Sequence, residues 1–161
     1  MAPPVNPGGE AITAEGLRAL EAELEELQTT ARQAMAERIK VARELGDLKE
    51  NAEYHIAKDD QAHLEAKIRR LRQRLGAAVT VDPDPSSQAF DFGRTAEVLD
   101  ETGGSTRTWT IVGPTEANVA EGRLSSESPV AQALLGRAAG ETVSVETPRG
   151  TRSYRIQKLL P

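Results

Sequence analysis

A long proline-free stretch from Thr13 to Leu45 constrains the fold of this chain more than any other feature. Ala, Glu, Leu, Arg and Gln dominate the stretch, and all five are strong helix formers. Thr13 suits the N-cap position, so one helix is expected from Thr13 to Leu45. Spacings that alternate between three and four predict a coiled-coil seam. The seam positions are Leu17, Leu20, Leu24, Leu27, Ala31, Ala34, Arg38, Val41 and Leu45.

The same pattern returns after a short acidic turn. Its seam positions are Tyr54, Ala57, Gln61, Leu64, Ile68, Leu71 and Leu75. Partners in an antiparallel hairpin should have residue numbers with a nearly constant sum, and these positions pair with sums of 98 or 99. Arg38 and Gln61, the two polar seam residues, fall in one layer, where we expect them to hydrogen-bond each other. The pattern therefore predicts a helical hairpin that ends at Gly76.

The turn itself, residues 46–54, carries the strongest candidate for chemistry. Asp47 and Glu50 are three residues apart, so a helix that began at Leu48 would point both carboxylates toward one spot, where they could share a divalent metal ion. A structural interpretation stands beside this one. Asp47 at the N-cap with Glu50 three residues later is a capping box, and Gly46 suits the end of the preceding helix. The two interpretations are compatible, because a cap also fixes the direction of a carboxylate.

A basic run near the end of the second helix faces acidic residues of the first helix in the same register. The basic residues are Lys67, Arg69, Arg70, Arg72 and Arg74, and the acidic ones are Glu21, Glu23, Glu25 and Glu26. This arrangement is typical of a salt-bridged coiled-coil flank, with a surface that contacts phosphate as the alternative. His55 and His63 are two full turns apart, too far for joint metal ligation, and are expected at the surface.

The second half follows a different pattern, in which Gly and Pro divide short alternating runs. Strands are expected over 95–99, 107–112, 142–146 and 153–159. Ser128 and Pro129 predict the start of a short helix over 130–135, and Gly136 its end. We therefore expect an α+β protein with a disordered tail over 1–10, a coiled-coil hairpin over 11–77 and a linker over 78–88. Residues 89–161 are expected to form a small twisted antiparallel sheet with one helix.

Composition excludes several classes of protein. The chain has no cysteine, so disulfides and thiolate metal sites are excluded, and a reducing cytoplasm is the expected compartment. No apolar run approaches the roughly 20 residues that cross a bilayer, so no membrane partner is expected. The net charge of −5 argues against nonspecific binding of duplex nucleic acid as the main activity, because such binding needs a basic surface.

Several separated motifs resemble the bacterial transcript-cleavage factors of the GreA/GreB family. They are Gly46-Asp47-Leu48-Lys49-Glu50-Asn51-Ala52-Glu53-Tyr54-His55 with Ala57-Lys58, Ile111-Val112-Gly113 with Glu116-Ala117, Ser128-Pro129-Val130-Ala131 with Leu134-Leu135-Gly136, and Thr147-Pro148 with Gly150. The motifs keep the family's order over about residues 12–159, so they are more specific than a single match. The resemblance implies an N-terminal coiled-coil domain and a C-terminal FKBP-like domain.

The resemblance also implies a function. Proteins of this family bind RNA polymerase, insert the coiled coil into its secondary channel and stimulate endonucleolytic cleavage of the nascent RNA in backtracked complexes. Asp47 and Glu50 match the tip acids that help to hold a second Mg²⁺ in the polymerase active site. Two carboxylates alone bind Mg²⁺ weakly, so we expect the ion in the complex and not on the isolated chain. The chain would then be a monomer that stimulates the polymerase and is no enzyme by itself.

The resemblance also implies roles for other residues, and each of these residues has a purely structural explanation as an alternative. Asn51 and Tyr54 are expected to position the tip or to contact RNA. Alternatively, Tyr54 continues the seam, and Asn51 can hydrogen-bond to backbone groups near the helix start. Glu127, Ser128 and Pro129 match the family segment implicated in polymerase contact, although Ser128 and Pro129 can also simply start a helix. Residues 118–123 depart from the family pattern, which leaves polymerase contacts there in doubt.

Three other functions are compatible with the sequence. A noncatalytic regulator could occupy the same polymerase channel and compete with other factors. A peptidyl-prolyl isomerase would follow from the FKBP-like domain, but Phe90, Phe92, Trp109 and Tyr154 are few and scattered for an aromatic pocket. A coiled-coil scaffold would need neither polymerase nor metal.

Overall fold

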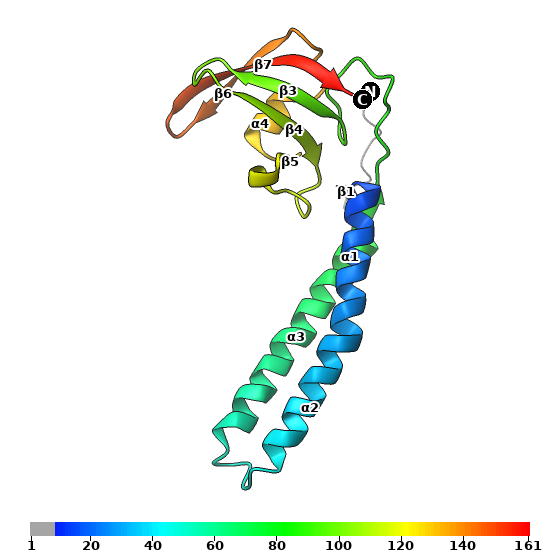
Figure 1. Ribbon diagram of the computed structural model, residues 1–161, viewed down its shortest axis with the longest axis vertical. Helices are drawn as coiled ribbons and strands as arrows, with labels where there is room; N and C mark the ends of the chain where they lie inside the picture. The colour runs from blue at the N-terminus through cyan, green and yellow to red at the C-terminus, as the bar shows by residue number, and fades with distance from the viewer. Residues whose placement is uncertain (1–8) are drawn as a thin grey trace. The chain divides into compact units, whose positions relative to one another are not determined.

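The computed structural model describes residues 9–161, which form two compact units. One unit, Leu17–Ala77, is helical apart from its turn. The other unit contains residues 9–16 together with Ala78–Pro161 and holds the strands. The expected α+β class, with a helical hairpin followed by a small sheet, is confirmed (Figure 1). Over the described range, no helix combines the length and the apolar character needed to span a membrane.

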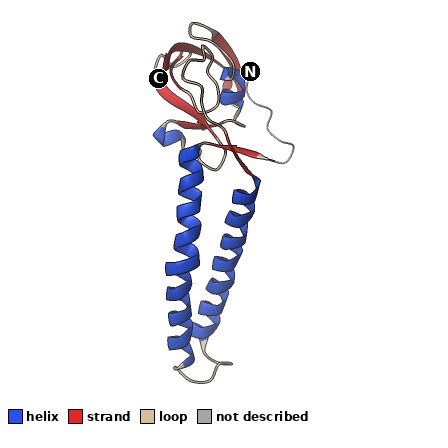
Figure 2. Ribbon diagram, turned by 90° about the vertical axis from the view of Figure 1, so that its right-hand side faces the viewer, coloured by secondary structure: helices blue, strands red, loops and turns tan. Residues whose placement is uncertain are grey.

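The helical unit is an antiparallel hairpin in which α2 and α3 lie side by side (Figure 2). Its elements are α1 (Ala14–Glu26), the π-helical turn η1 (Leu27–Ala31), α2 (Arg32–Arg43) and α3 (Ala52–Ala77). Thr13 caps α1 as predicted, because its hydroxyl accepts a hydrogen bond from the Gly16 backbone N–H at 3.0 Å. Helix α3 continues through Gly76 and ends at Ala77, the last residue of the expected hairpin. A glycine inside a helix costs only about 1 kcal/mol, which packing readily offsets.

The predicted seam is shifted by one residue in α2. In α3 the expected residues Ala57, Ile68 and Leu71 are buried. In α2 the buried residues are instead Ile39 and Ala42, with 6% and 4% of their surface exposed. The seam predicted for α2 is therefore wrong, and its members Ala34, Arg38 and Val41, as well as Leu45 beyond the helix end, are exposed.

The π-helical turn accounts for this shift. The backbone N–H of Arg32 bonds to the carbonyl of Leu27, five residues earlier, so this turn holds about one residue more than an α-helical turn. Every later residue is rotated by one position around the helix axis, about 100°. A strict heptad would have placed Arg38 against α3, whereas the shifted helix places Ile39 there. The π turn thus avoids the free-energy cost of burying a guanidinium.

The predicted hydrogen bond between Arg38 and Gln61 is also wrong. Arg38, rotated out of the seam, donates from Nη1 to Asp60 Oδ2 at 2.7 Å. The amide oxygen of Gln61 accepts from Lys58 Nζ at 2.9 Å. Both contacts lie at the surface, where ion pairs contribute little to stability.

Two further ion pairs connect the arms of the hairpin. Lys67 Nζ lies 3.3 Å from Glu23 Oε1, which confirms a contact between the predicted basic and acidic flanks. Arg32 makes a bidentate pair with Glu65, with N···O distances of 2.9 and 2.8 Å. The hydrogen bonds from Arg32 hold the pKa of Glu65 below its ordinary value, and those to Glu65 raise the pKa of Arg32.

The second unit is built on a five-stranded sheet with the order β5-β4-β3-β7-β6. Its elements are β3 (Thr95–Asp100), β4 (Thr106–Val112), the 3₁₀ turn η2 (Val119–Glu121), β5 (Arg123–Ser125), α4 (Pro129–Leu134), β6 (Thr142–Thr147) and β7 (Gly150–Leu160). The four predicted strands and the predicted helix are present. The sheet is mixed, however, because the unpredicted strand β5 runs parallel to β4. The expectation of a purely antiparallel sheet is therefore wrong.

The core of this unit lies between the sheet and α4. It contains the fully buried side chains Phe90, Ile111, Leu134, Ile156 and Val98. Alternation along the strands produces this core, since every second residue of β3 from Ala96 to Asp100 is buried. Ser128 caps α4 through its hydroxyl, which accepts from the Ala131 N–H at 3.2 Å.

A small parallel pair of strands, β1 (Glu10–Ile12) and β2 (Ala78–Thr80), belongs to the same unit. The structure corrects two expectations here, since Glu10 belongs to β1 and not to a disordered tail, and Ala78–Thr80 forms β2 and not part of a linker. Three-residue strands are too short for their alternation to be recognised. The rest of the expected tail, residues 1–8, lies outside the described residues.

The remainder of the expected linker is tied to the sheet unit by a buried arginine. Arg94, only 6% exposed, donates to the carbonyls of Asp84, Ser87 and Leu160 at 2.7, 2.8 and 3.3 Å. These bonds satisfy most of a guanidinium that would otherwise be costly to bury. Hydrogen bonds from Ser86 also lower the pKa of Asp84.

Candidate functional site

The turn between α2 and α3 is organised by Asn51 and not by the predicted capping box. Helix α3 begins at Ala52, and Asn51 Oδ1 accepts from the Tyr54 N–H at 3.1 Å, which is an N-cap bond. Asp47 lies outside the helix and accepts from the Lys49 N–H at 3.0 Å, which closes a local turn. The capping box and the helix start at Leu48 are therefore wrong. The turn also needs Gly46, whose φ of +124° favours glycine.

The Asn51 side chain also connects the two arms of the hairpin. Its Nδ2 donates to the carbonyl oxygen of Ala42 in α2 at 2.5 Å. One amide thus caps the start of α3 and satisfies a carbonyl near the end of α2, where helix carbonyls lack intrahelical partners. The residues between Ala42 and Asn51 are held at both ends by this side chain.

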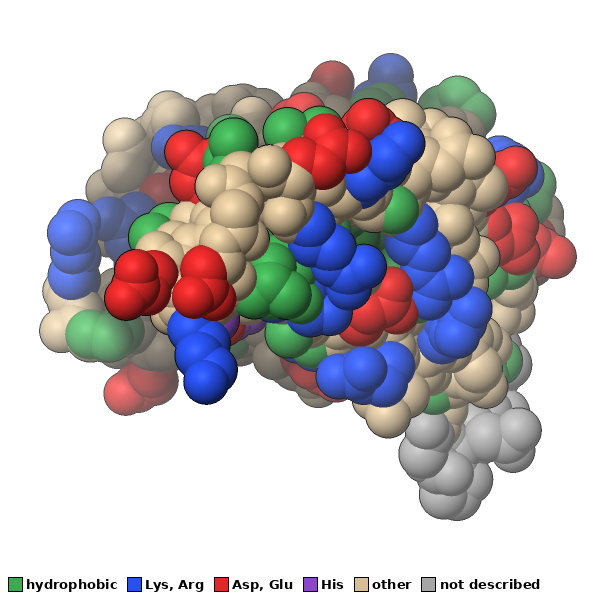
Figure 3. Space-filling model, turned by 90° about the horizontal axis from the view of Figure 1, so that it is seen from below, with side chains coloured by type: hydrophobic (Ala, Val, Ile, Leu, Met, Phe, Trp, Pro, Cys, Tyr) green, Lys and Arg blue, Asp and Glu red, His purple; other side chains and the backbone are tan. Residues whose placement is uncertain are grey.

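Asp47 and Glu50 lie in one shallow hollow of about 390 Å³, which we call the acidic hollow. It is lined by Leu45, Asp47, Glu50, Asn51, Ala52 and Glu53. Both carboxylates are exposed, and the hydrogen bond from Lys49 fixes one oxygen of Asp47 and leaves the other free. Seen from below, acidic side chains lie at this surface beside hydrophobic and basic ones (Figure 3).

The donor set of the acidic hollow suits a shared Mg²⁺ site. Mg²⁺ prefers carboxylate oxygens and commonly keeps several water ligands or takes phosphate oxygens. Asp47 and Glu50 supply two accessible carboxylates of this kind. From Gly9 to the C-terminus, no three Asp, Glu, His or Cys side chains are grouped so that they could hold a metal ion. The residues therefore fit an ion whose other ligands come from a partner.

A second hollow, of about 440 Å³, carries basic side chains and was missed by sequence reasoning. We call it the basic hollow; it is lined by Ala36, Ile39, Lys40, Arg43, Glu44, Lys58 and Gln61. The Arg43 guanidinium lies 5.8 Å from the centre of the Tyr54 ring, a cation–π distance. Tyr54 is half-buried and so keeps its seam position while one ring face meets Arg43. The sequence did contain a signal for this hollow, because the antiparallel register pairs Lys40 with Lys58.

Glu127, Ser128 and Pro129 lie in the sheet unit at the start of α4. Ser128 is structurally engaged, since it caps α4 and donates to the Ser125 carbonyl at 2.7 Å. The side chains of Glu127 and Pro129 are exposed. These three residues thus form a separate candidate surface, and their role in polymerase contact stays a prediction.

Comparisons with known families match nearly the whole chain. The family model described as "Transcription elongation factor, N-terminal" matches residues 10–79. The model described as "Transcription elongation factor, GreA/GreB, C-term" matches residues 85–161.

Relatives of known name cover most of the chain as well. The transcription elongation factor GreA of Ruegeria pomeroyi is 44% identical over 90% of this chain and 93% of its own. GreA of Chloroflexus aggregans is 46% identical over 92% of this chain and 95% of its own. Among solved structures, the GreA factor homolog 1 (Gfh1) of Thermus thermophilus is 28% identical over 95% of this chain and 99% of its own, with a TM-score of 0.41. The two family models and the close relatives together show that this chain belongs to the GreA/GreB family of transcription elongation factors.

Proposed function

We propose that this chain binds RNA polymerase through its secondary channel and stimulates endonucleolytic cleavage of the nascent RNA in backtracked complexes. The observation that carries the proposal is the acidic hollow, where Asp47 and Glu50 expose carboxylates at the turn of the hairpin. The chain contributes these groups to a reaction of the polymerase and does not catalyse alone. It acts as a monomer in the cytoplasm, and its targets are the polymerase and the RNA 3′ end.

Each side chain of the turn has a distinct part in this proposal. Asp47 presents one free oxygen, because its other oxygen is fixed by the Lys49 N–H. Glu50 supplies the second carboxylate, and Asn51 positions the turn by bonding to both helices. Mg²⁺ bound with the help of these carboxylates would supply an activated water and stabilise the leaving oxygen.

The basic hollow supports a contact with the RNA. Lys40, Arg43 and Lys58 place three cations on the hairpin close to its turn, where phosphates of the transcript would be attracted. Tyr54, held against Arg43, offers an aromatic ring of the kind on which single-stranded bases stack.

Stalled elongation complexes test the proposal directly. We expect D47N/E50Q to abolish the release of 3′ RNA fragments and to bind polymerase as the wild type does. E21Q/E25Q is the matched control, because it removes the same charge from exposed positions of α1 and should cleave normally. Full cleavage by D47N/E50Q would reject the metal-binding role. Altered pausing without any fragments, even from the wild type, would show a noncatalytic regulator instead.

A further inference from the structure

An apolar groove of about 550 Å³ lies between α2 and α3 close to the turn. Its apolar lining comes from Ala34, Val41, Ala42 and Ile56, and Glu37, Arg38 and Glu53 complete it. We call this surface the tip groove. It lies within the helical unit and is distinct from the basic hollow, with which it shares no residue.

The tip groove is part of an unusually apolar surface. Val41 and Ile56 are 49% and 55% exposed, and Leu45 and Leu48 continue the apolar surface toward the turn with 61% and 41% exposed. Between residues 9 and 161, only one other large hydrophobic side chain, Val119, is comparably exposed. Hydrophobic side chains are visible at this end of the hairpin (Figure 3). A clustered apolar surface rimmed by polar groups marks an interaction site.

The π-helical turn explains why this surface is exposed. In an uninterrupted heptad, Val41 and Leu45 would pack against α3. With the extra residue in η1, Ile39 and Ala42 pack against α3 in place of Arg38 and Val41, and Val41 is turned toward solvent. Apolar residues therefore lie on two faces of α2, and only one of these faces packs against α3.

The charges of the tip groove indicate the kind of partner that fits it. Glu37 and Glu53 make no ion pair with any described residue, whereas Arg38 is paired with Asp60 at 2.7 Å. The rim thus presents two free carboxylates above an apolar floor. A complementary partner carries apolar side chains next to lysine or arginine.

We propose that the tip groove binds a protein segment of RNA polymerase whose apolar side chains are flanked by basic ones. This inference rests on the proposed function, because it requires the hairpin to act on the polymerase. Glu53 also lines the acidic hollow, so a segment seated in the groove lies beside the tip acids. A basic side chain of the segment neutralises Glu53, and the docking fixes the position of Asp47 and Glu50.

The apolar part of the proposal is tested with the full-length chain and core RNA polymerase. We expect V41S/I56S to weaken binding about thirtyfold, measured by fluorescence anisotropy of a labelled chain, since two half-exposed apolar side chains lose their contact. V41I/I56V exchanges the two side chains and keeps the apolar volume, so it should bind within about twofold of the wild type. Wild-type affinity of V41S/I56S, with an unchanged circular dichroism spectrum, would overturn the proposal.

The charge of the partner is tested separately. E37K should weaken binding more than E37Q, and E26K, a reversal at an exposed position of α1, should have little effect. Tighter binding by E37K would overturn the proposed basic partner. A wild-type dimer in light scattering that V41S/I56S converts to a monomer would also overturn it, because the groove would then bind a second copy. If D47N/E50Q still binds polymerase and loses cleavage, the proposed function stands even where the groove proposal fails.

Discussion

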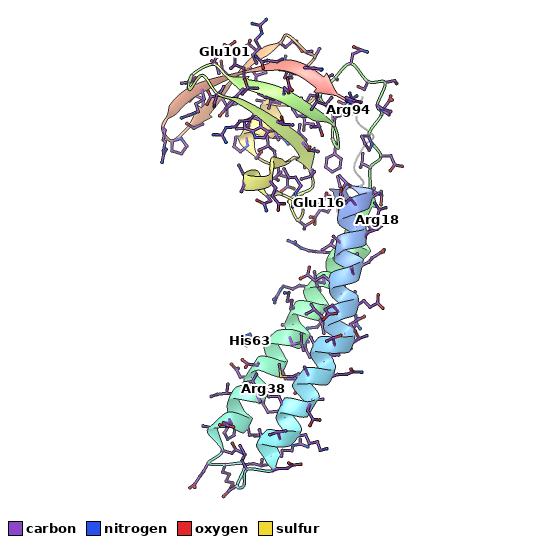
Figure 4. The ribbon with its side chains drawn as sticks, viewed as in Figure 1. Arg18, Arg38, His63, Arg94, Glu101 and Glu116 are labelled. Carbon is purple, nitrogen blue, oxygen red and sulfur yellow. The ribbon has the colours of Figure 1, made fainter. Side chains whose placement is uncertain are left out.

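Replacing Glu116 with alanine should destabilise the sheet unit, because this carboxylate satisfies donors from two segments that are far apart in the sequence. Glu116 follows β4, and its carboxylate accepts hydrogen bonds from the Thr13 and Gly113 N–H groups at 3.0 and 2.9 Å. It also accepts from the Thr13 hydroxyl. Glu116 therefore holds the N-cap of α1 against the loop after β4, all within one compact unit (Figure 4).

The expected loss of unfolding free energy follows from the hydrogen-bond donors that E116A leaves without an acceptor. Two backbone N–H groups lose a charged acceptor, and hydrogen bonds to charged groups contribute about 1.5–3 kcal/mol each. Because the site is half-buried, water replaces part of this contribution, and we expect a total loss of about 3 kcal/mol. E116Q keeps one acceptor but turns an NH₂ group toward a donor, so its loss should be smaller, about 1–2 kcal/mol.

Urea unfolding followed by Trp109 fluorescence measures this loss. Trp109 is the only tryptophan of the chain, and it is 7% exposed in β4, three residues before Val112 at the strand end. E101A is the control, because the exposed carboxylate of Glu101 accepts no hydrogen bond from any described residue. A wild-type urea midpoint for E116A, or an equal loss for E101A, would refute the reasoning.

Three further predictions test local contacts. Alanine normally stabilises a helix by about 1 kcal/mol relative to glycine, but G16A should lower stability because the added Cβ would clash with the Glu116 carboxylate; thermal unfolding gives the sign of the change. N51D keeps the N-cap acceptor but loses the donor to α2, so amide exchange of residues 44–50 should accelerate about fivefold or more, measured by hydrogen exchange mass spectrometry. Pairing with Arg32 lowers the pKa of Glu65, so this pair stabilises the hairpin above the ordinary carboxylate pKa and the stabilisation is lost as the pH falls through the lowered pKa. E65Q should therefore lose less helical circular dichroism on acidification than the wild type does.

The sequence predicted the elements that repeat a pattern over many residues. The heptads of both arms, interrupted at Gly46, were sufficient for the hairpin and its antiparallel direction. Alternating runs that are bounded by Gly and Pro residues were sufficient to predict the four long strands. Ser128 and Pro129 were sufficient to predict α4. Short elements without a repeat, such as β1, β2 and β5, were missed because three residues carry too little pattern.

The start of α3 shows a different limit, because two neighbouring residues competed for one role. Asp47 and Asn51 are both good N-cap residues, and a Glu three positions after Asp47 favoured the earlier start. The structure selects Asn51, whose amide also reaches Ala42, nine residues away. A carboxylate could not donate that bond. The candidate acids were thus identified correctly as turn residues, while the local geometry that orients them was not.

The shifted seam of α2 depends on a choice that no local pattern reveals. Two sets of residues in α2 have a spacing suitable for a seam. One set is 34, 38 and 41, and the other is 35, 39 and 42. They differ chiefly in that the first contains Arg38 where the second contains Ile39. Burying isoleucine in place of arginine favours the second set, and one π turn is sufficient to select it. The same selection exposes Val41 beside the acidic residues of the turn. The packing of the hairpin and the surface that it presents next to Asp47 and Glu50 therefore have a single cause, and deleting Thr30 to restore a regular α-helix should bury Val41 and remove the tip groove together.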